Sequence, residues 1–251
     1  MKVTIYLLLC SFMCCLGCSN STETNLPDNN HTDTFFQPAQ VLFIGNSHTN
    51  YNNGVSFHLR GFLNQADLPY TPVVEKMTMD GYTIQQHSEN ANTLAKMAER
   101  DWDIMVFQEN TSEAANNPVD ATIAIQELRF KVPNSETRLF LFMTWAYESM
   151  PGMLTTIKKT YEDTAPLVNG TIVPVGLAFQ EIQNDPENLI SLYDPDGIHP
   201  SLGGTFLASA MFYASIYEKD PRLNPYNADL TEEVAAYLKE KAYEVVQNYS
   251  E

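Results

Sequence analysis

The stretch Val-Leu-Phe-Ile-Gly-Asn-Ser-His-Thr, residues 41–49, decides the fold. Its four apolar residues end at a glycine, as in a short buried strand. Gly45 and Asn46 tolerate turn conformations, and the apolar spacing over residues 55–68 predicts a helix. Ser47 therefore follows the carboxyl end of a strand, where open α/β sheets place their ligands. Taken alone, Ser47 is explained equally well as a helix-capping serine in an ordinary turn.

The alternation of apolar strands and helices continues along the chain. Further strands are predicted at 70–77, 103–107, 138–143 and 171–175, and further helices at 84–100, 118–131, 153–168, 202–217 and 230–248. Asp229 is the expected cap of the last helix, and Pro174 places the last strand at an edge. Strands that alternate with helices favour a parallel sheet covered on both faces. The predicted fold class is therefore α/β.

The first residues have the pattern of an export signal. Lys2 precedes an apolar run from residue 3 to residue 16, which is shorter than the ~20 residues that span a membrane. A small residue followed by Cys18 resembles a bacterial lipobox. We expect a lipoprotein signal peptide at 1–17 and lipidation of Cys18. Because Cys15 is atypical of a lipobox, plain secretion with another cleavage point stays open.

Residues 18–37 consist mainly of Ser, Thr, Asn, Asp and Pro, which is typical of a flexible tether. A single domain is expected at 38–251. This organisation predicts an exported protein held on the periplasmic or cell-surface face of a membrane by its lipid anchor. All four cysteines lie at positions 10–18, so the domain has none for a disulfide, a zinc-thiolate site or a nucleophile.

The formal net charge of −17 limits the kinds of partner and substrate that are expected. Such an acidic surface repels phosphate backbones, and no basic cluster offsets it, so nucleic acid is excluded as an expected partner. The same field disfavours strongly anionic substrates. A neutral substrate is therefore favoured.

A second polar segment, Asp-Gly-Ile-His-Pro-Ser at 196–201, carries candidate chemistry. Asp196 and His199 lie three residues apart, so the carboxylate can meet the ring, and Pro200 keeps His199 out of helical geometry. The other ring nitrogen could then take a proton from a serine hydroxyl. A lone Asp-x-x-His is more often a solvated turn. Asp194, Asp196 and His199 could alternatively form part of a metal site, which would need further ligands.

Together these segments resemble the SGNH (GDSL-type) hydrolases. Gly-Asn-Ser-His around Ser47 is similar to the first motif block of that family, and Asp196 to His199 to its last block. Gly81 falls where the family has its oxyanion-hole glycine. Asn110, within Gln-Glu-Asn-Thr at 108–111, falls on the oxyanion-hole asparagine. The resemblance covers about residues 40–218, and no Gly-x-Ser-x-Gly indicates an α/β-hydrolase elbow.

The resemblance implies a three-layer α/β/α sandwich with a mainly parallel, flavodoxin-like sheet of five strands. It implies Ser47, Asp196 and His199 as a catalytic triad, and no cofactor or metal. The backbone N–H groups of Ser47 and Gly81 and the Asn110 amide would form the oxyanion hole. The sequence departs from the family pattern in three places: Asn46 stands where Asp is usual, and Gln108 and Thr111 stand where Gly and Asp are usual.

These expectations favour a surface-tethered serine esterase that removes short acyl groups, most plausibly acetyl, from a carbohydrate. His48, Gln108 and Trp145 are candidate substrate contacts, although Trp145 could equally pack against a helix. A lipase or thioesterase of the same superfamily stays open. Two other classes remain alternatives: a non-catalytic glycan-binding lipoprotein, and a glycosidase that uses Glu109 with a second carboxylate.

Overall fold

Five short strands form a parallel sheet. They are β1 (Gln40–Gly45), β2 (Val73–Thr78), β3 (Ile104–Phe107), β4 (Arg138–Phe142) and β5 (Gly170–Val173). Their order is β2-β1-β3-β4-β5, as in flavodoxin-like folds, and every neighbouring pair is parallel. The predicted α/β class and parallel sheet are confirmed, and β5 lies at an edge as Pro174 indicated.

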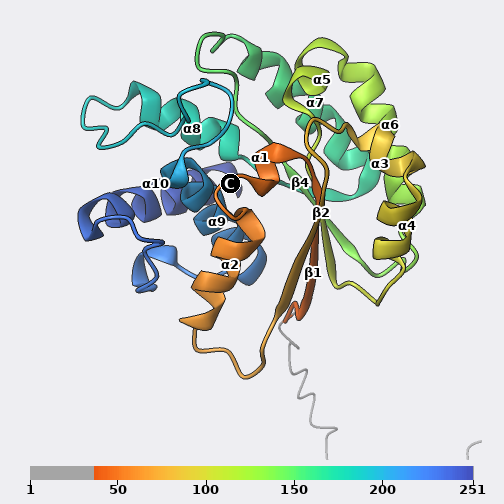
Figure 1. The fold of residues 1–251 in the computed structure, drawn as a ribbon, viewed down its shortest axis with the longest axis horizontal. Coiled ribbons are helices and arrows are strands. Elements are labelled where there is room, and N and C mark those ends of the chain that lie inside the picture. The colour runs from red at the N-terminus through yellow and green to blue at the C-terminus, as the bar shows by residue number, and fades with distance from the viewer. Residues whose placement is uncertain (1–36, 251) are drawn as a thin grey trace, which may run out of the picture. The chain divides into compact units, whose positions relative to one another are not determined.

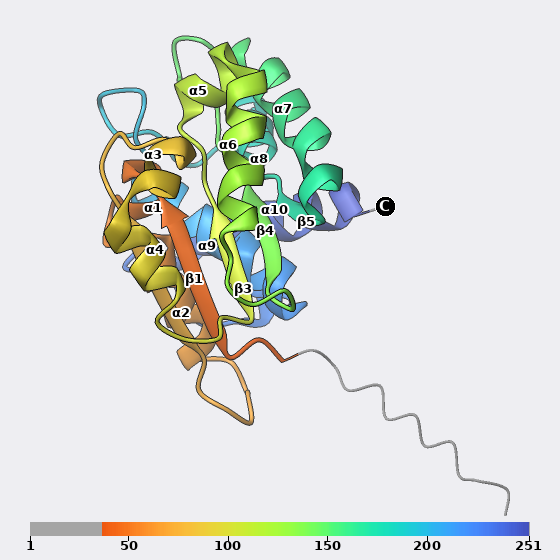
Figure 2. The ribbon, with the colours of Figure 1, turned by 90° about the vertical axis from the view of Figure 1, so that its right-hand side faces the viewer.

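Helices cover both faces of the sheet (Figures 1 and 2). One layer contains α2 (Val55–Asn64), α8 (Val175–Asn184), α9 (Leu202–Tyr217) and α10 (Glu232–Ser250). The other contains α3 (Ile84–Glu89), α4 (Ala91–Met97), α5 (Thr111–Asn116), α6 (Pro118–Phe130) and α7 (Met153–Val168). Alternate strand residues point into two separate apolar cores, one under each layer. The chain is thus a three-layer α/β/α sandwich.

The structure, a computed structural model, describes residues 37–250. The expected signal peptide at 1–17, the lipidated Cys18 and nearly all of the tether lie outside the described residues. Between residues 37 and 250, none of the helices is both long and apolar enough to cross a membrane.

Residues at helix starts account for the main differences from the predicted elements. The helix expected at 84–100 is broken at Asn90, whose side chain accepts hydrogen bonds from the N–H groups of Asn92 and Thr93 and so starts α4. The strand expected at 171–175 ends early, and Pro174 begins the unpredicted helix α8. Asp229 as cap of the last helix is wrong: it lies in a turn with φ 62°, and the Thr231 hydroxyl accepts from the N–H of Val234 instead.

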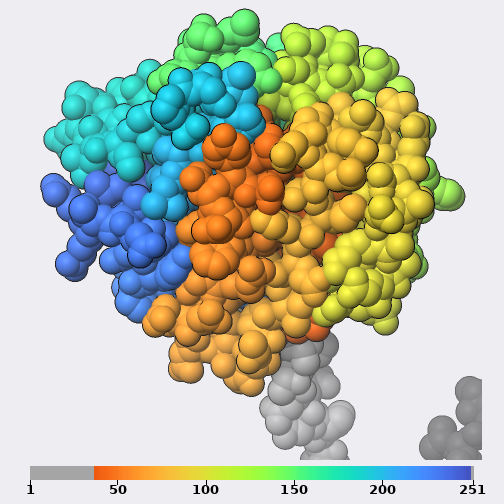
Figure 3. All heavy atoms as spheres, viewed as in Figure 1, coloured from red at the N-terminus to blue at the C-terminus, as the bar shows by residue number. Residues whose placement is uncertain are grey.

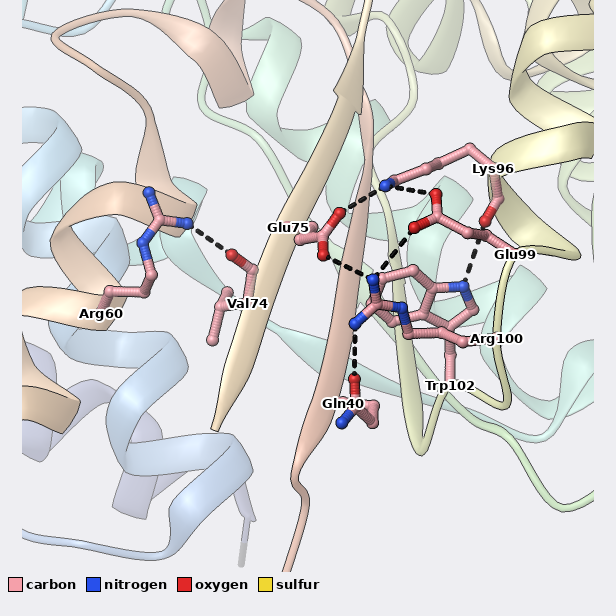
Figure 4. A network of polar contacts seen from close by, with 8 residues as sticks. All are labelled: Gln40, Arg60, Val74, Glu75, Lys96, Glu99, Arg100 and Trp102. Carbon is pink, nitrogen blue, oxygen red and sulfur yellow. Dashed lines mark hydrogen bonds and ion pairs between the residues drawn. The ribbon is translucent and has the colours of Figure 1, made fainter. Parts of the chain in front are cut away.

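Charged side chains surround β2, which is the strand at one edge of the sheet (Figure 4). Glu75 on β2 forms ion pairs with Lys96 of α4 and with Arg100, the latter at 3.1 Å. Arg100 also donates to Gln40 of β1 at 3.1 Å and lies over the buried Trp102 ring. On the other side of β2, Arg60 of α2 donates to the carbonyl of Val74. A charged side chain that occupies a carbonyl of an edge strand discourages pairing with another chain.

Candidate active site

The strand order creates a crevice at the carboxyl ends of β1 and β3. The connection after β1 runs to β2, whereas β3 lies on the other side of β1. Such a reversal of strand order is where open α/β sheets bind ligands. Ser47 follows β1 and Asn110 follows β3, so the topology alone brings two of the predicted site residues to this crevice.

Ser47 is the first residue of the short helix α1 (Ser47–Asn50), and Asn46 caps that helix. The Asn46 side chain accepts from the N–H of His48 at 3.0 Å and donates to the carbonyl of Tyr82 at 2.9 Å. Gly45 allows this turn because a side chain there would meet the Gln108 Oε1 at 2.5 Å. Ser47 is consequently half-buried and fixed at the crevice.

The loop before α9 carries Asp196 and His199 to the same place. Asp196 Oδ1 accepts from the N–H groups of Ile198 and His199, both at 2.9 Å. Its Oδ2 lies 2.5 Å from Nδ1 of His199, and Nε2 of His199 lies 2.9 Å from Oγ of Ser47. The hydrogen bond from the His199 ring, together with the two N–H groups, lowers the pKa of Asp196 to about 2.

The two segments that form this hydrogen-bonded line are separated by about 150 residues in sequence yet lie side by side. Figure 3 shows the orange segment after β1 beside the light-blue segment that leads into α9, both at the surface. Because Asp196 stays exposed and Ser47 half-buried, the line opens to solvent at both ends. The structure therefore brings Ser47, His199 and Asp196 together in the order that a Ser-His-Asp arrangement requires.

Aromatic rings hold His199 in this position. Tyr51 stacks on the His199 ring with a centroid distance of 4.3 Å and an interplanar angle of 9°. Trp145 donates from its indole N–H to the carbonyl of Ile198 at 3.0 Å and stacks on Phe179. Sequence reasoning missed Tyr51, because no pattern in the chain shows that a tyrosine four residues after Ser47 packs on a histidine so far away.

Gly81 and Asn110 also meet at the crevice. Gly81 has φ +74° and open space where a side chain would point. The Asn110 side chain caps α5 through Oδ1 and donates from Nδ2 to the Gly81 carbonyl at 3.1 Å. Among residues 37–250, no hydrogen-bond acceptor is found for the N–H of Ser47 or of Gly81. These two N–H groups remain available to a ligand.

Two of the expected substrate contacts are wrong. Gln108 is 1% exposed, and both ends of its amide are hydrogen-bonded: Oε1 accepts from the N–H of Asn46 and the hydroxyl of Thr49, while Nε2 donates to the Glu109 carbonyl. Trp145 is also 1% exposed and packs in the core. Neither side chain offers a surface to a substrate. Both support the loops of the site from beneath.

His48 lies buried beneath His199, with a ring centroid distance of 5.5 Å. Burial, assisted by the nearby His199, lowers the pKa of His48 to about 3, so its ring is neutral. Its Nδ1 atom has no partner among the described residues. At 5% exposure the ring supports the loop that carries Ser47 from below and presents no face to a substrate, so the expected direct contact is wrong.

The structure does not support the two other hypotheses for the site, a glycosidase that uses Glu109 and a metal site at Asp194, Asp196 and His199. Glu109 is completely buried, so it cannot flank a glycosidic bond. Within the described part of the chain, no group of three His, Cys, Asp or Glu side chains is placed to hold a metal ion, and this includes Asp194, Asp196 and His199.

Comparison with known proteins identifies the fold. No family model and no curated protein matches the sequence. A solved DUF4886 family protein from Bacteroides uniformis is 17% identical over 84% of this chain and 95% of its own, with a TM-score of 0.68. A putative SGNH hydrolase from Slackia heliotrinireducens is 21% identical over 69% and 96%, with a TM-score of 0.58. A lipase/acylhydrolase from Enterococcus faecalis is 14% identical over 71% and 96%, with a TM-score of 0.59. The resemblance seen in the motifs thus extends to the architecture: this chain has the fold of the SGNH hydrolases.

Proposed function

We propose that this protein is a serine esterase that hydrolyses short-chain acyl esters, acetyl esters above all, on carbohydrates. The observation that carries the proposal is the line of hydrogen bonds from Asp196 through His199 to Ser47. A serine hydroxyl is a weak nucleophile at neutral pH and needs a neighbouring base. Here the base and the carboxylate that orients it are already within hydrogen-bonding distance.

In the proposed mechanism Ser47 Oγ attacks the ester carbonyl while Nε2 of His199 takes its proton. Asp196 holds the Nδ1–H tautomer of His199 and stabilises the imidazolium that forms. His199 then gives the proton to the departing alcohol, and a water molecule, activated by the same ring, hydrolyses the acyl-enzyme. The half-buried Ser47 and exposed Asp196 allow both alcohol and water to enter from solvent.

The oxyanion of the tetrahedral intermediate would be bound by three donors. They are the backbone N–H groups of Ser47 and Gly81, which have no acceptor among the described residues, and the second N–H of the Asn110 amide. Such donors stabilise charge that develops only in the transition state, and losing one costs on the order of 10²–10³ in turnover. The oxyanion hole expected from the motifs is part of this proposal.

Polar groups around the site favour a hydrophilic alcohol over a lipid. Ser112, two residues after Asn110, shares a 2.7 Å hydrogen bond with the Tyr147 hydroxyl. The exposed Glu148 lies against Gly197, the residue after Asp196. Hydroxyls and a carboxylate are the groups that bind sugar hydroxyls. The net charge of −17 further disfavours an anionic substrate.

The sequence adds a proposed location. The Cys18 lipobox would export the protein and hold it by a lipid anchor on the periplasmic or cell-surface face of a membrane. Radiolabelled palmitate should be incorporated into the wild-type protein and not into Cys18→Ala. Equal incorporation, or none, would contradict the anchor.

The function is tested by hydrolysis of p-nitrophenyl esters of increasing acyl length, in wild type, Ser47→Ala and the control Ser135→Ala. Ser135 is an exposed serine whose hydroxyl donates to its neighbour Glu136. We expect turnover that is highest on the acetate, is abolished in Ser47→Ala and is unchanged in Ser135→Ala. Highest activity on long acyl chains would instead identify a lipase or thioesterase. Equal inactivity of all three would favour a non-catalytic glycan-binding protein.

A further inference from the structure

A buried carboxyl group, which the proposed mechanism does not use, lies directly behind the candidate oxyanion hole. Glu109 is the residue before Asn110 and is 0% exposed. Its Oε1 atom accepts two backbone hydrogen bonds, from the N–H of Ile84 at 3.0 Å and from the N–H of Asn110 at 2.6 Å. Burying a carboxyl group costs folding free energy unless hydrogen bonds compensate for the lost water. The two bonds to Oε1 provide part of that compensation, and they connect Glu109 to two segments of the site.

The two N–H groups belong to different loops of the site. Ile84 begins α3 and ends the loop that carries Gly81, whereas Asn110 ends the connection from β3 to α5. The Asn110 amide makes a second link between the same loops, through the Gly81 carbonyl at 3.1 Å. Glu109 and Asn110 thus tie the Gly81 loop to the Asn110 loop from the inside and from the outside.

The position of Glu109 is itself fixed from the far side. Its backbone N–H donates to the hydroxyl of Tyr161 on α7 at 3.2 Å. Tyr161 is fully buried and bonds to Thr144, which also accepts from the hydroxyl of Thr111 at 2.9 Å. These buried hydrogen bonds fix the position of Glu109. Its Oε1 atom can therefore set the spacing of the two loops.

We infer that Glu109 is a positioning residue of the proposed esterase: by holding the Ile84 and Asn110 N–H groups on one oxygen, it sets the Gly81 N–H and the Asn110 amide at the spacing that one oxyanion requires. This role rests on the proposed function, because it acts through the oxyanion hole and not on the substrate.

The surroundings of Glu109 keep it neutral. Its second oxygen, Oε2, is buried without a hydrogen-bond partner among the described residues. Burial raises the pKa of Glu109 to about 8; the hydrogen bonds from the N–H groups of Ile84 and Asn110 oppose this rise, and the nearby Glu113 of α5 adds to it. Tyr161 faces it from α7 as a neutral phenol, since burial raises the Tyr161 pKa well above its ordinary value. From α3, the backbone N–H of Ile84 bonds to it. Above about pH 8 an unpaired negative charge would therefore form beside the oxyanion, and turnover should fall.

The test compares Glu109→Ala and Glu109→Gln with wild type, using p-nitrophenyl acetate between pH 6 and 9.5. Alanine removes the acceptor, so kcat should fall by about 10- to 100-fold, while KM should change by less than about 3-fold. This fall in kcat is smaller than the 10²–10³ that the loss of a whole oxyanion-hole donor costs. Glutamine keeps an uncharged Oε1, so kcat at pH 7 should stay within about 3-fold of wild type, and the decline above about pH 8 should disappear.

Two controls separate this role from general destabilisation. Glu113→Gln removes the neighbouring charge without touching either loop contact. Asn224→Ala removes a buried hydrogen bond to the Phe62 carbonyl at the end of α2. Both should keep wild-type kcat at pH 7, even where Asn224→Ala lowers the melting temperature as much as Glu109→Ala does.

Amide hydrogen exchange measures the two hydrogen bonds to Glu109 Oε1 directly and does not depend on enzyme activity. The N–H groups of Ile84 and Asn110 should be protected in wild type and in Glu109→Gln and should exchange at least 10-fold faster in Glu109→Ala. Unchanged exchange in the alanine variant, or unchanged kcat in a folded alanine variant of an active enzyme, would overturn the inference. If the protein shows no esterase activity but the protection still depends on Glu109, the proposed function is refuted, whereas the link that Glu109 makes between the two loops is confirmed.

Discussion

Replacing Asp196 by Asn tests the physical role of the carboxylate most sharply, because the change removes a charge and keeps the shape. Asn can still accept from the N–H groups of Ile198 and His199 through its oxygen, as Asp196 does at 2.9 Å. The loop should therefore keep its conformation. The new NH₂ group, however, would face Nδ1 of His199 where Oδ2 now lies at 2.5 Å.

Two effects of Asp196→Asn add. A donor facing Nδ1 selects the tautomer with hydrogen on Nε2, which cannot take the proton of Ser47. The lost attraction between carboxylate and imidazolium at about 4 Å is ~1 kcal/mol in water and ~4 kcal/mol near a protein surface. Asp196 is 39% exposed, so the charge term alone lies between these limits. With ~1.4 kcal/mol for each tenfold in rate and the tautomer effect added, we expect kcat/KM to fall by about 10²–10³.

The assay is steady-state hydrolysis of p-nitrophenyl acetate, with thermal unfolding as a check on the fold. The melting temperature should stay close to wild type, because Asp196 is exposed and a surface pair contributes little stability. A folded Asp196→Asn variant with kcat/KM within about 3-fold of wild type would refute the assignment of Asp196. A loss as complete as in Ser47→Ala would show that the carboxylate does more than orient and stabilise His199.

Three further changes test the supporting structure. Asn46→Asp installs the residue that is usual in SGNH hydrolases. It replaces the NH₂ group that donates to the Tyr82 carbonyl by an oxygen that the carbonyl repels. The unfolding free energy, measured by urea titration, should therefore fall by about 1–3 kcal/mol. Gly204→Ala places a methyl 2.4 Å from the Leu192 carbonyl, so both melting temperature and kcat should fall. The buried Glu109 keeps its proton up to about pH 8, whereas the unfolded chain releases it near pH 4.5; wild-type stability should therefore fall as pH rises between these values, and Glu109→Gln should lose that slope.

The sequence predicts the sheet and the long helices well because their apolar patterns are local. The helix expected at 153–168 matches α7, and the one expected at 202–217 matches α9. The short helices α1 and α5 escape prediction, since helices of this length gain little from their own hydrogen bonds. They form because Asn46 and Asn110 cap them at the ends of β1 and β3, and a single asparagine in sequence indicates equally well a plain turn.

The candidate site is predictable where its spacing is local or matches known motifs, and not where burial decides. Ser47, Asp196 and His199 meet as the motifs indicated. Gln108 and Trp145 looked like substrate contacts because polar and aromatic residues at strand ends often are. Their burial depends on contacts with segments distant in sequence, such as Thr49 for Gln108 and Phe179 for Trp145. No local pattern carries that information.

The central claim is that Ser47 is a nucleophile activated by His199, and covalent labelling tests it most directly. The protein is treated with a fluorophosphonate, and the modified peptide is located by mass spectrometry in wild type, His199→Ala and Ser135→Ala. The account predicts one adduct, on Ser47, in wild type and Ser135→Ala, and labelling at least 100-fold slower in His199→Ala. No adduct in wild type, an adduct on another serine, or equal labelling without His199 would contradict it.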